Sequence, residues 1–205
     1  GRNVLVLGGA GFIGSYVARA WADAGAEVTV ADFRPPGPES RFVLGSSTDF
    51  DLVEISVTDA EEVHRLVDAA RPTDIVHLAA VVNPVALATD PRQALDVNVR
   101  GTINVLEAAH RHGVARVVYL SSIGVLPSVL YEPIDANHPV VTATEGPGSG
   151  FYGASKVASE AFCFAYQSGL GVDVRIVRPS AVYGFGMQWP IYVKPIVEGA
   201  VRGER

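Results

Sequence analysis

The 205-residue sequence is poor in the features that mark several classes of protein. Its one cysteine, Cys163, excludes an intrachain disulfide, and no group of residues has the spacing of a zinc site. Lys and Arg number 16 against 22 Asp and Glu, which leaves a net charge of −6 and no basic surface for nucleic acid or an anionic membrane. No apolar run approaches the roughly 20 residues of a membrane-spanning helix. We therefore expect a cytoplasmic protein with no metal, nucleic acid or membrane partner, acting on a small molecule.

The remaining composition is that of an ordinary globular protein. Hydrophobic residues make up 48% of the chain and charged residues 19%, which is enough for one sizeable core. Phe162 and Phe164 flank Cys163, so this thiol is expected to be packed and inert. One domain, with the start of a second, is predicted.

Short β-branched runs alternate with helical patterns from the first residues onward. Apolar residues recur at helical spacing from Ile13 to Ala24, from Val63 to Ala70 and from Leu95 to Leu106, and a last helix is expected from Tyr192 to Val201. This alternation predicts an α/β fold, a Rossmann-type doubly wound parallel sheet with helices on both faces. The predicted strands are Val4–Leu7, Glu27–Ala31, Leu52–Ile55, Ile75–Leu78, Arg116–Leu120 and Val172–Val177.

Glycine and proline punctuate this pattern. Gly25 and Gly113 each stand just past a helical pattern and before a strand, where a left-handed residue closes a helix. Between Pro127 and Gly150 the periodicity lapses, and this stretch predicts a long loop over the site.

A glycine loop with the spacing G-x-x-G-x-x-G follows the first predicted strand and opens the first helix. Glycines at Gly8, Gly11 and Gly14 permit a tight turn and let a pyrophosphate approach the backbone at a helix N-terminus. Phe12 and Ile13 lie inside the loop and are expected to contact the cofactor with Gly8 and Gly11. No Walker-type lysine follows, which excludes a nucleotide-hydrolysing P-loop.

An acid ends the second predicted strand. Asp32 lies about 20 residues beyond the loop, where a carboxylate accepts hydrogen bonds from the adenosine ribose and repels a 2′-phosphate. This position favours NAD over NADP. Arg34 offers a partner for a 2′-phosphate, but a solvated loop arginine is the simpler interpretation of a residue before Pro35 and Pro36.

Three side chains form a candidate catalytic group. Tyr152 and Lys156 stand at i and i+4, which places them on one helix face. An ammonium near a phenol stabilises phenolate and brings the phenol toward proton exchange at neutral pH. Ser122 follows the strand Arg116–Leu120, at the edge of a parallel sheet where ligands bind. Each signal is weak alone, and the three together with the glycine loop are specific.

The sequence resembles the extended short-chain dehydrogenase/reductases, the NAD-dependent epimerase/dehydratase family, over nearly its whole length. Six stretches in order carry this resemblance: Val6–Gly14, Val76–Ala80, Asn98–Thr102, Leu120–Ser122, Tyr152–Lys156 and Arg178–Gly184.

The resemblance implies roles for these residues. Tyr152 would transfer the proton, Ser122 would hydrogen-bond the same substrate oxygen, and Lys156 would lower the pKa of the tyrosine and bind the nicotinamide ribose. Asn98 would be a buried polar contact near the site, and His77 is expected to be packed. The other cofactor contacts implied are Leu78, Ala79 and Ala80, together with Pro179 and Val182 at the nicotinamide end.

The sequence departs from the family pattern at several positions. Ser56, followed by Val57, stands where an acid commonly precedes the hydrophobic residue that meets the adenine, so a serine is expected to bind adenine more weakly. Gly124–Pro127 replaces a segment that usually brings an aromatic to the substrate side, and Phe185 stands where proline is frequent.

The chain stops at Arg205, where members of the family continue into a substrate-binding lobe. We expect residues 1–180 to form the NAD-binding Rossmann domain and residues 181–205 to begin a C-terminal substrate lobe that is truncated or missing. By family analogy the helices that contain Asn98 and Tyr152 could pair in a homodimer.

Three functions fit these observations. The first is an NAD-dependent epimerase or dehydratase of a nucleotide sugar, with transient hydride transfer to NAD. The second is a net NAD(P)-dependent oxidoreductase of a ketone, aldehyde or hydroxysteroid-like alcohol, which the apolar Val125, Leu126, Val129 and Leu130 favour. A non-catalytic dinucleotide-binding protein is the third, and the intact Ser122, Tyr152 and Lys156 argue against it.

Overall fold

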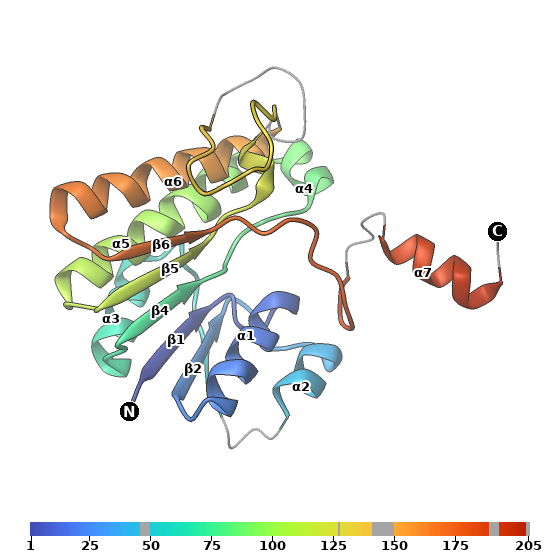
Figure 1. Cartoon of the computed structure of the whole chain (residues 1–205). Helices are drawn as coiled ribbons and strands as arrows, with labels where there is room; N and C mark the ends of the chain where they lie inside the picture. Colours follow the sequence, from blue (N-terminus) through green and yellow to red (C-terminus); the bar gives the residue numbers. More distant parts are fainter. Residues whose placement is uncertain (46–49, 127, 141–149, 189–192, 204–205) are drawn as a thin grey trace.

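A computed structural model describes residues 1–45, 50–126, 128–140, 150–188 and 193–203. Six parallel strands form one sheet in the order β3-β2-β1-β4-β5-β6 (Figure 1). The predicted doubly wound Rossmann-type sheet is therefore confirmed. The strands are β1 Asn3–Leu7, β2 Glu27–Asp32, β3 Asp51–Glu54, β4 Asp74–His77, β5 Arg116–Leu120 and β6 Val174–Val177.

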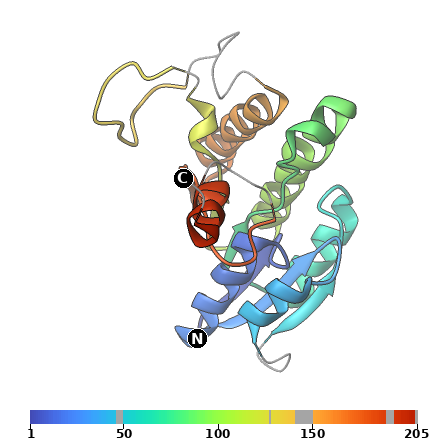
Figure 2. The same cartoon turned by 90° about the vertical axis from the view of Figure 1, so that its right-hand side faces the viewer.

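Helices cover both faces of this sheet. Helices α1 and α2 pack together on one face, and α3, α5 and α6 pack on the other (Figures 1 and 2). The helical elements are α1 Phe12–Asp23, α2 Pro38–Leu44, α3 Ala60–Ala70, α4 Pro84–Thr89, the π-helix η2 Ala94–Arg100, α5 Gly101–Arg111, the 3₁₀ turn η3 Ile123–Val125, α6 Phe151–Leu170 and α7 Val193–Arg202.

The core lies in two layers, one on each face of the sheet. Successive side chains of a strand point to opposite faces, so Leu5 and Leu7 of β1 enter one cluster while Val4 and Val6 enter the other. All four are fully buried. A strand that is apolar at every position, as β1 is, therefore belongs at the centre of a sheet covered on both sides.

The strand order reverses direction at β1, because β2 lies on one side of it and β4 on the other. In open parallel sheets, ligands bind at such a switch point, outside the carboxyl ends of the strands. The site residues described below gather along that edge.

Two short helices, α2 and α4, were not predicted from the sequence. Each has only six or seven residues, too few for an amphipathic pattern to repeat. Their signals are local instead: Pro38 and Pro84 occupy the first helical position of each, and the Asn83 carboxamide caps α4 by accepting from the amides of Val85 and Ala86.

Other boundaries differ by one or two residues from the prediction. Strand β6 begins at Val174 rather than Val172, and β3 and β4 each begin and end one residue earlier. The helix predicted across Leu95–Leu106 begins as the π-helix η2 and continues as α5. Gly25 and Gly113 have φ angles of +82° and +66°, which confirms them as helix-closing residues.

The last helix, α7, stands apart from the sheet in Figure 1 and buries none of its residues. It corresponds to the helix predicted from Tyr192 to Val201, although Tyr192 itself lies outside the described residues. In the long loop, residues 128–140 contain no helix or strand, as predicted, whereas residues 127 and 141–149 lie outside the described residues. No helix within the described ranges is long and apolar enough to cross a bilayer.

Candidate active site

The glycine loop connects β1 to α1 and lies against the end of β4. Gly8 has a φ of +81°, and a Cβ atom built on it would stand 2.6 Å from the backbone nitrogen of Ala79. A Cβ on Gly14 would overlap the carbonyl of Gly8. Only glycine fits at either position, which brings the loop, β4 and α1 closer together than any other residue would allow.

The first turn of α1 keeps its amide groups available for a ligand. Its N-cap residue, Gly11, has no side chain to cap them, and the first turn contains no acidic side chain. The N–H groups of a helix N-terminus carry partial positive charge and bind anions such as a pyrophosphate.

Asp32 lies at the end of β2 beside this loop. Its Oδ2 accepts a hydrogen bond from the Ala10 amide at 3.1 Å, and its Oδ1 accepts one from the Phe33 amide at 2.8 Å. Burial raises the pKa of Asp32, and the two amides partly offset this effect. The carboxylate borders a cavity of about 160 Å³ that Arg34, on the solvated side of the loop, also lines.

Ser56 and Val57 follow β3, one strand further along the edge. The Ser56 amide donates to the Glu62 carboxylate, and its hydroxyl pairs with that of Thr58 at 2.8 Å. Val57 is buried, and its side chain lies so close to Gly101 that a Cβ there would stand 2.7 Å from it. Val57 therefore sets the distance between the loop after β3 and the start of α5.

Leu78, Ala79 and Ala80 continue from β4 past the glycine loop, and all three are half-buried. The Leu78 amide still donates to the Leu7 carbonyl at 2.8 Å, so the pairing of β4 with β1 extends one residue beyond the strand. The segment is thereby held beside Gly8, where the sequence places a cofactor contact.

Asn98, in the π-helix, joins that segment to α6. Its Oδ1 accepts from the Val81 amide at 2.8 Å, while its Nδ2 donates to the Val81 carbonyl and to the Ser155 hydroxyl. Asn98 is 1% exposed, and its bond to Ser155 is buried while those to Val81 are partly buried. Its side chain positions the backbone after β4 against α6, and sequence reasoning missed both Val81 and Ser155.

Ser122, Tyr152 and Lys156 meet at the carboxyl end of β5. Lys156 is 2% exposed, and its Nζ donates to the Leu120 carbonyl at 2.7 Å. The same Nζ lies 4.8 Å from the ring centre of Tyr119 and 5.8 Å from that of Tyr152. Ser122 follows two residues after Leu120, and its Oγ accepts from the Gly124 amide at 3.0 Å.

The charges of this group are set by burial. Burial lowers the pKa of Lys156 to about 8. Burial also raises the pKa of Tyr152, and hydrogen bonding with Ser122 partly offsets that rise. The pKa of Tyr152 is thus raised on balance, and the lowering of this pKa by Lys156 that the resemblance implies stays a prediction.

A buried ion pair braces helix α6. Glu160, four residues after Lys156, receives two hydrogen bonds from the Arg178 guanidinium at 2.9 and 2.7 Å. The same guanidinium reaches the carbonyl of His138, a buried residue of the long loop, at 3.4 Å. Sequence reasoning missed this pair, because the i, i+4, i+8 spacing places Glu160 on the same helix face as Tyr152 and Lys156 without identifying Arg178 as its partner.

Pro179 and Val182 lie beyond β6 on the same edge. The Pro179 carbonyl accepts from the Ile123 amide at 2.9 Å, which ties this segment to the turn after Ser122. Val182 remains 39% exposed and free to contact a ligand.

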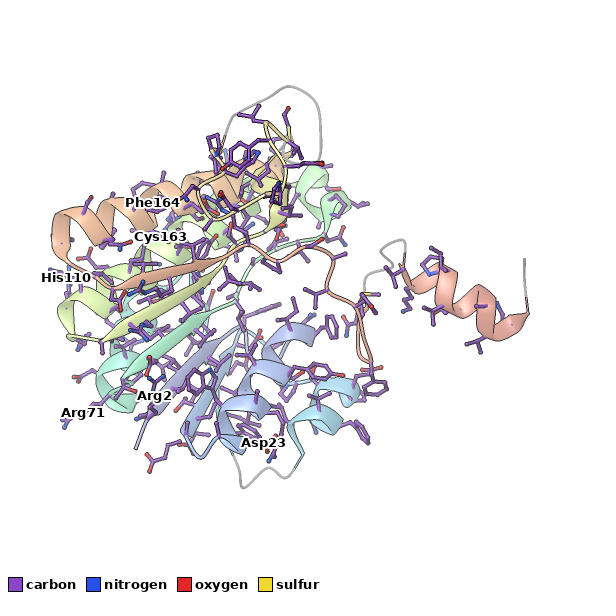
Figure 3. The ribbon with its side chains drawn as sticks, in the orientation of Figure 1. Arg2, Asp23, Arg71, His110, Cys163 and Phe164 are labelled. Carbon is purple, nitrogen blue, oxygen red and sulfur yellow. The ribbon has the colours of Figure 1, made fainter. Side chains whose placement is uncertain are left out.

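Two residues expected to be packed are packed. His77 is buried, its Nε2 lies 3.1 Å from the Thr102 hydroxyl, and burial lowers its pKa to about 3. Cys163 lies on the sheet-facing side of α6 (Figure 3), and burial raises its pKa to about 12. Within the described residues, no group of three or more His, Cys, Asp or Glu side chains is arranged to hold a metal ion.

The apolar residues after Ser122 do not all face a substrate. Val125 is fully buried and Leu126 is 5% exposed, because the η3 turn directs them into the core. Val125 and Leu126 therefore do not support an apolar substrate. Val129 and Leu130, which are 51% and 56% exposed, still support an apolar substrate.

The profile of the NAD dependent epimerase/dehydratase family matches residues 4–200, almost the entire chain. The chain belongs to this family. Among curated members of the epimerase/dehydratase family, UDP-glucose 4-epimerase of Mycolicibacterium smegmatis is 34% identical over 184 residues, which cover 89% of this chain and 56% of that protein. The dTDP-glucose 4,6-dehydratase of Streptomyces antibioticus is 32% identical over 210 residues, covering 95% and 57%.

Solved structures agree with this membership. The Bordetella bronchiseptica enzyme WbmG, in complex with NAD and UDP, has a TM-score of 0.79 and 30% identity, with coverage of 100% of this chain and 61% of its own. UDP-glucose 4-epimerase of Thermotoga maritima with UDP-glucose has a TM-score of 0.83 and 27% identity, with 99% and 64% coverage. This epimerase/dehydratase chain thus spans a little over half the length of the relatives that it matches.

Proposed function

We propose that the protein is an NAD-dependent epimerase or dehydratase that acts on a nucleotide sugar. The observation that carries this proposal is the meeting of Ser122, Tyr152 and Lys156 at the carboxyl edge of β5, on the same edge as the glycine loop and Asp32. A cofactor bound along this edge would lie beside a proton-transferring group, as redox chemistry on an alcohol requires.

The site fits NAD. Gly8 lets the loop pack directly on the backbone of Ala79, and the uncapped N–H groups at the start of α1 can bind a pyrophosphate. Asp32 borders the neighbouring cavity and can accept from the adenosine ribose. NAD, when bound, supplies the hydride acceptor of the reaction.

The chain's own residues supply the proton chemistry. As phenolate, the Tyr152 oxygen takes the proton from the substrate hydroxyl and becomes the neutral phenol, while Ser122 donates a hydrogen bond to the same substrate oxygen. Burial raises the pKa of Tyr152, so forming this phenolate depends on positive charge beside the ring. Lys156, whose pKa of about 8 leaves most molecules protonated at neutral pH, places positive charge beside the tyrosine ring. The buried Glu160–Arg178 pair holds the helix that carries both residues.

The nucleotide-sugar assignment is supported by the names of the relatives. The epimerase of Mycolicibacterium smegmatis and the dehydratase of Streptomyces antibioticus are named for nucleoside-diphosphate sugars, and WbmG was crystallised with NAD and UDP. The assignment of residues 1–180 to cofactor binding and residues 181–205 to the start of a substrate lobe belongs to the same proposal.

A net oxidoreductase of a ketone, aldehyde or hydroxysteroid-like alcohol is the second candidate. The exposed Val129 and Leu130, on the loop that His138 anchors, favour it, because a sugar diphosphate prefers polar walls.

The two candidates differ in how they use the cofactor. We would denature the purified full-length protein and identify the released dinucleotide by mass spectrometry and absorbance. Stoichiometric NAD is expected, since an epimerase or dehydratase regenerates its cofactor within each cycle. An empty protein that binds and exchanges added cofactor each turnover would instead establish the oxidoreductase.

Assembly as a homodimer through the helices that contain Asn98 and Tyr152 is also proposed. The exposed apolar side chains of Leu95, Phe151 and Phe164 on these helices support it. Sedimentation of the full-length protein tests it, and a monomer at all concentrations would contradict it.

A further inference from the structure

The segment after β6 crosses the carboxyl edge of the sheet. It leaves β6 at one side of the sheet and runs, in orange-red in Figure 1, to the neighbourhood of α1 and α2 at the other side. We call residues 183–187 the strap. Pro179, a few residues before the strap, bonds to the turn after Ser122, whereas α2, near the far end of the strap, contributes Arg41 to the cavity beside Asp32.

Three contacts fasten the far end of the strap. The rings of Phe185 and Phe42, on α2, meet edge to face with centroids 5.4 Å apart and an interplanar angle of 67°. The Tyr16 hydroxyl donates to the Phe185 carbonyl at 3.2 Å. Gly186, with a φ of +85°, passes so close to Glu39 that a Cβ would stand 3.2 Å from it. The backbone turns sharply here and packs directly on α2.

The strap also crosses the amino end of α1. A Cβ on Gly184 would lie 3.7 Å from the ring of Phe12, the residue that follows Gly11 of the glycine loop. A dinucleotide that reaches from Asp32 over the glycine loop to Lys156 runs along the same edge. The strap therefore lies across the route by which this ligand enters and leaves.

The fastening is shallow. Phe42 is 79% exposed and Phe185 is 56% exposed, so each ring buries only part of its surface in their contact. An aromatic pair of this kind is a weak interaction, and the single hydrogen bond from Tyr16 adds little. The strap can open without disturbing the core.

We propose that the strap is a latch that retains the bound dinucleotide, and that separation of Phe185 from Phe42 limits its release. This inference rests on the proposed NAD-binding function. The latch accounts for the phenylalanine at a position where the family pattern often has proline. A proline side chain would leave Phe42 without its aromatic partner.

The first experiment measures the release rate of NAD. Purified protein loaded with isotopically labelled NAD is mixed with excess unlabelled NAD, and the retained label is followed with time. Phe42→Ala removes a ring that does not line the cavity beside Asp32, and we expect release to accelerate by about threefold to tenfold. Leu170→Ala is the matched control, since this apolar side chain is 48% exposed at the last residue of α6 and does not contact the strap.

A double variant tests whether the two rings act on each other. If Phe185 holds the strap through Phe42, then Phe42→Ala combined with Phe185→Ala should release NAD no faster than the faster single variant. Multiplication of the two single effects would show that the rings act separately and would overturn the latch.

Crosslinking the strap to α2 should slow the release of NAD instead of accelerating it. In Phe42→Cys with Phe185→Cys, a short bismaleimide can join the two exposed thiols, because the one native cysteine is buried with a raised pKa. Crosslinking after loading should slow release by about tenfold or more. Release at the wild-type rate from both the crosslinked protein and Phe42→Ala would refute the latch, whereas a wild-type protein that binds no NAD would refute the proposed function itself.

Discussion

The two edges of the sheet carry different kinds of polar side chain. At the amino edge, Asp173 pairs with Arg116 at 3.0 Å and with Arg175 at 2.9 Å, and Arg2, labelled in Figure 3, lies 3.8 Å from Asp74. The arginines of these pairs are all well exposed. At the carboxyl edge, Lys156 is almost fully buried and bonds to a backbone carbonyl.

By cavity size alone, the amino edge would be chosen as the site instead. The amino edge has a cavity of about 450 Å³ lined by residues that include Asp68, Arg71 and His112, whereas the cavity beside Asp32 holds about 160 Å³. The proposed catalytic residues nevertheless lie at the carboxyl edge, where burial shifts the pKa values of Lys156 and Tyr152. Perturbed groups held by the backbone identify a site better than the volume of a hollow does.

The largest effect is expected from the phenol at the carboxyl edge. Tyr152→Phe removes the proton-transferring oxygen, and turnover by the full-length protein should fall by about 10²- to 10⁴-fold while NAD binding is retained. Tyr166→Phe, on the same helix, removes a hydroxyl that bonds to Glu107 and should leave turnover unchanged. Equal activity of the two variants would remove Tyr152 from the mechanism.

Two glycines with nearly the same φ angle lie at opposite edges of the sheet. Gly8 and Gly25 have φ angles of +81° and +82°, but a Cβ meets Ala79 at Gly8 and nothing within 4 Å at Gly25. Gly25→Ala should cost only the left-handed conformation, about 1–2 kcal/mol of stability, and bind NAD normally. Gly8→Ala should lose NAD affinity by about 100-fold or more, measured by calorimetry. Similar NAD affinities of the two variants would contradict a role for the close approach of Gly8 to Ala79 in cofactor binding.

The pH dependence of stability reports on the buried lysine. Lys156 has a pKa of about 8 when folded and an ordinary value of 10.5, so between these values the folded state loses a proton that the unfolded state keeps. The free energy of unfolding should therefore rise with pH, by about 2 kcal/mol between pH 7.5 and 9.5. Urea titrations should show this rise in Lys194→Met and not in Lys156→Met, and its persistence in the latter would assign it elsewhere.

The smallest effect is expected at the amino edge. The hydrogen bond from Arg116, with the charge of Arg175, lowers the pKa of Asp173 below 3.8. The stability that this gives is present above pH 3.8 and is lost as the pH falls through the lower, folded value. Asp173→Asn should leave turnover unchanged and lower the melting temperature slightly at pH 7 and not in strong acid. A loss of turnover would mean that the two edges are coupled.

The elements that set this comparison differ in how well the sequence predicts them. The apolar run of β1 and the glycine spacing after it are local patterns, so the sheet and the cofactor loop were predictable. The helices α2 and α4 were not, because each depends on a proline and a cap rather than on periodicity.

At the site, the sequence predicted which residues lie there but not which partners they contact. Sequence spacing placed Tyr152 and Lys156 on one face, but it gave no account of Leu120 as the acceptor for Lys156 or of Arg178 as the partner of Glu160. Both contacts join residues far apart in the chain through the order of the strands. The balance between burial and charge at Tyr152 likewise depends on packing that no motif records.

In the π-helix η2, the number of residues matters as well as which residues they are. Asn98 lies within it, and its carbonyl accepts from the hydroxyls of Thr102 and Ser159 while its side chain holds Val81. Each residue of a helix advances the side chains by about 100° around the axis. Removal of a single residue from 94–100 would restore an ordinary helical repeat and turn Asn98 away from one set of partners. Alanine substitutions on the exposed face of this helix are therefore tolerable where a one-residue deletion is not.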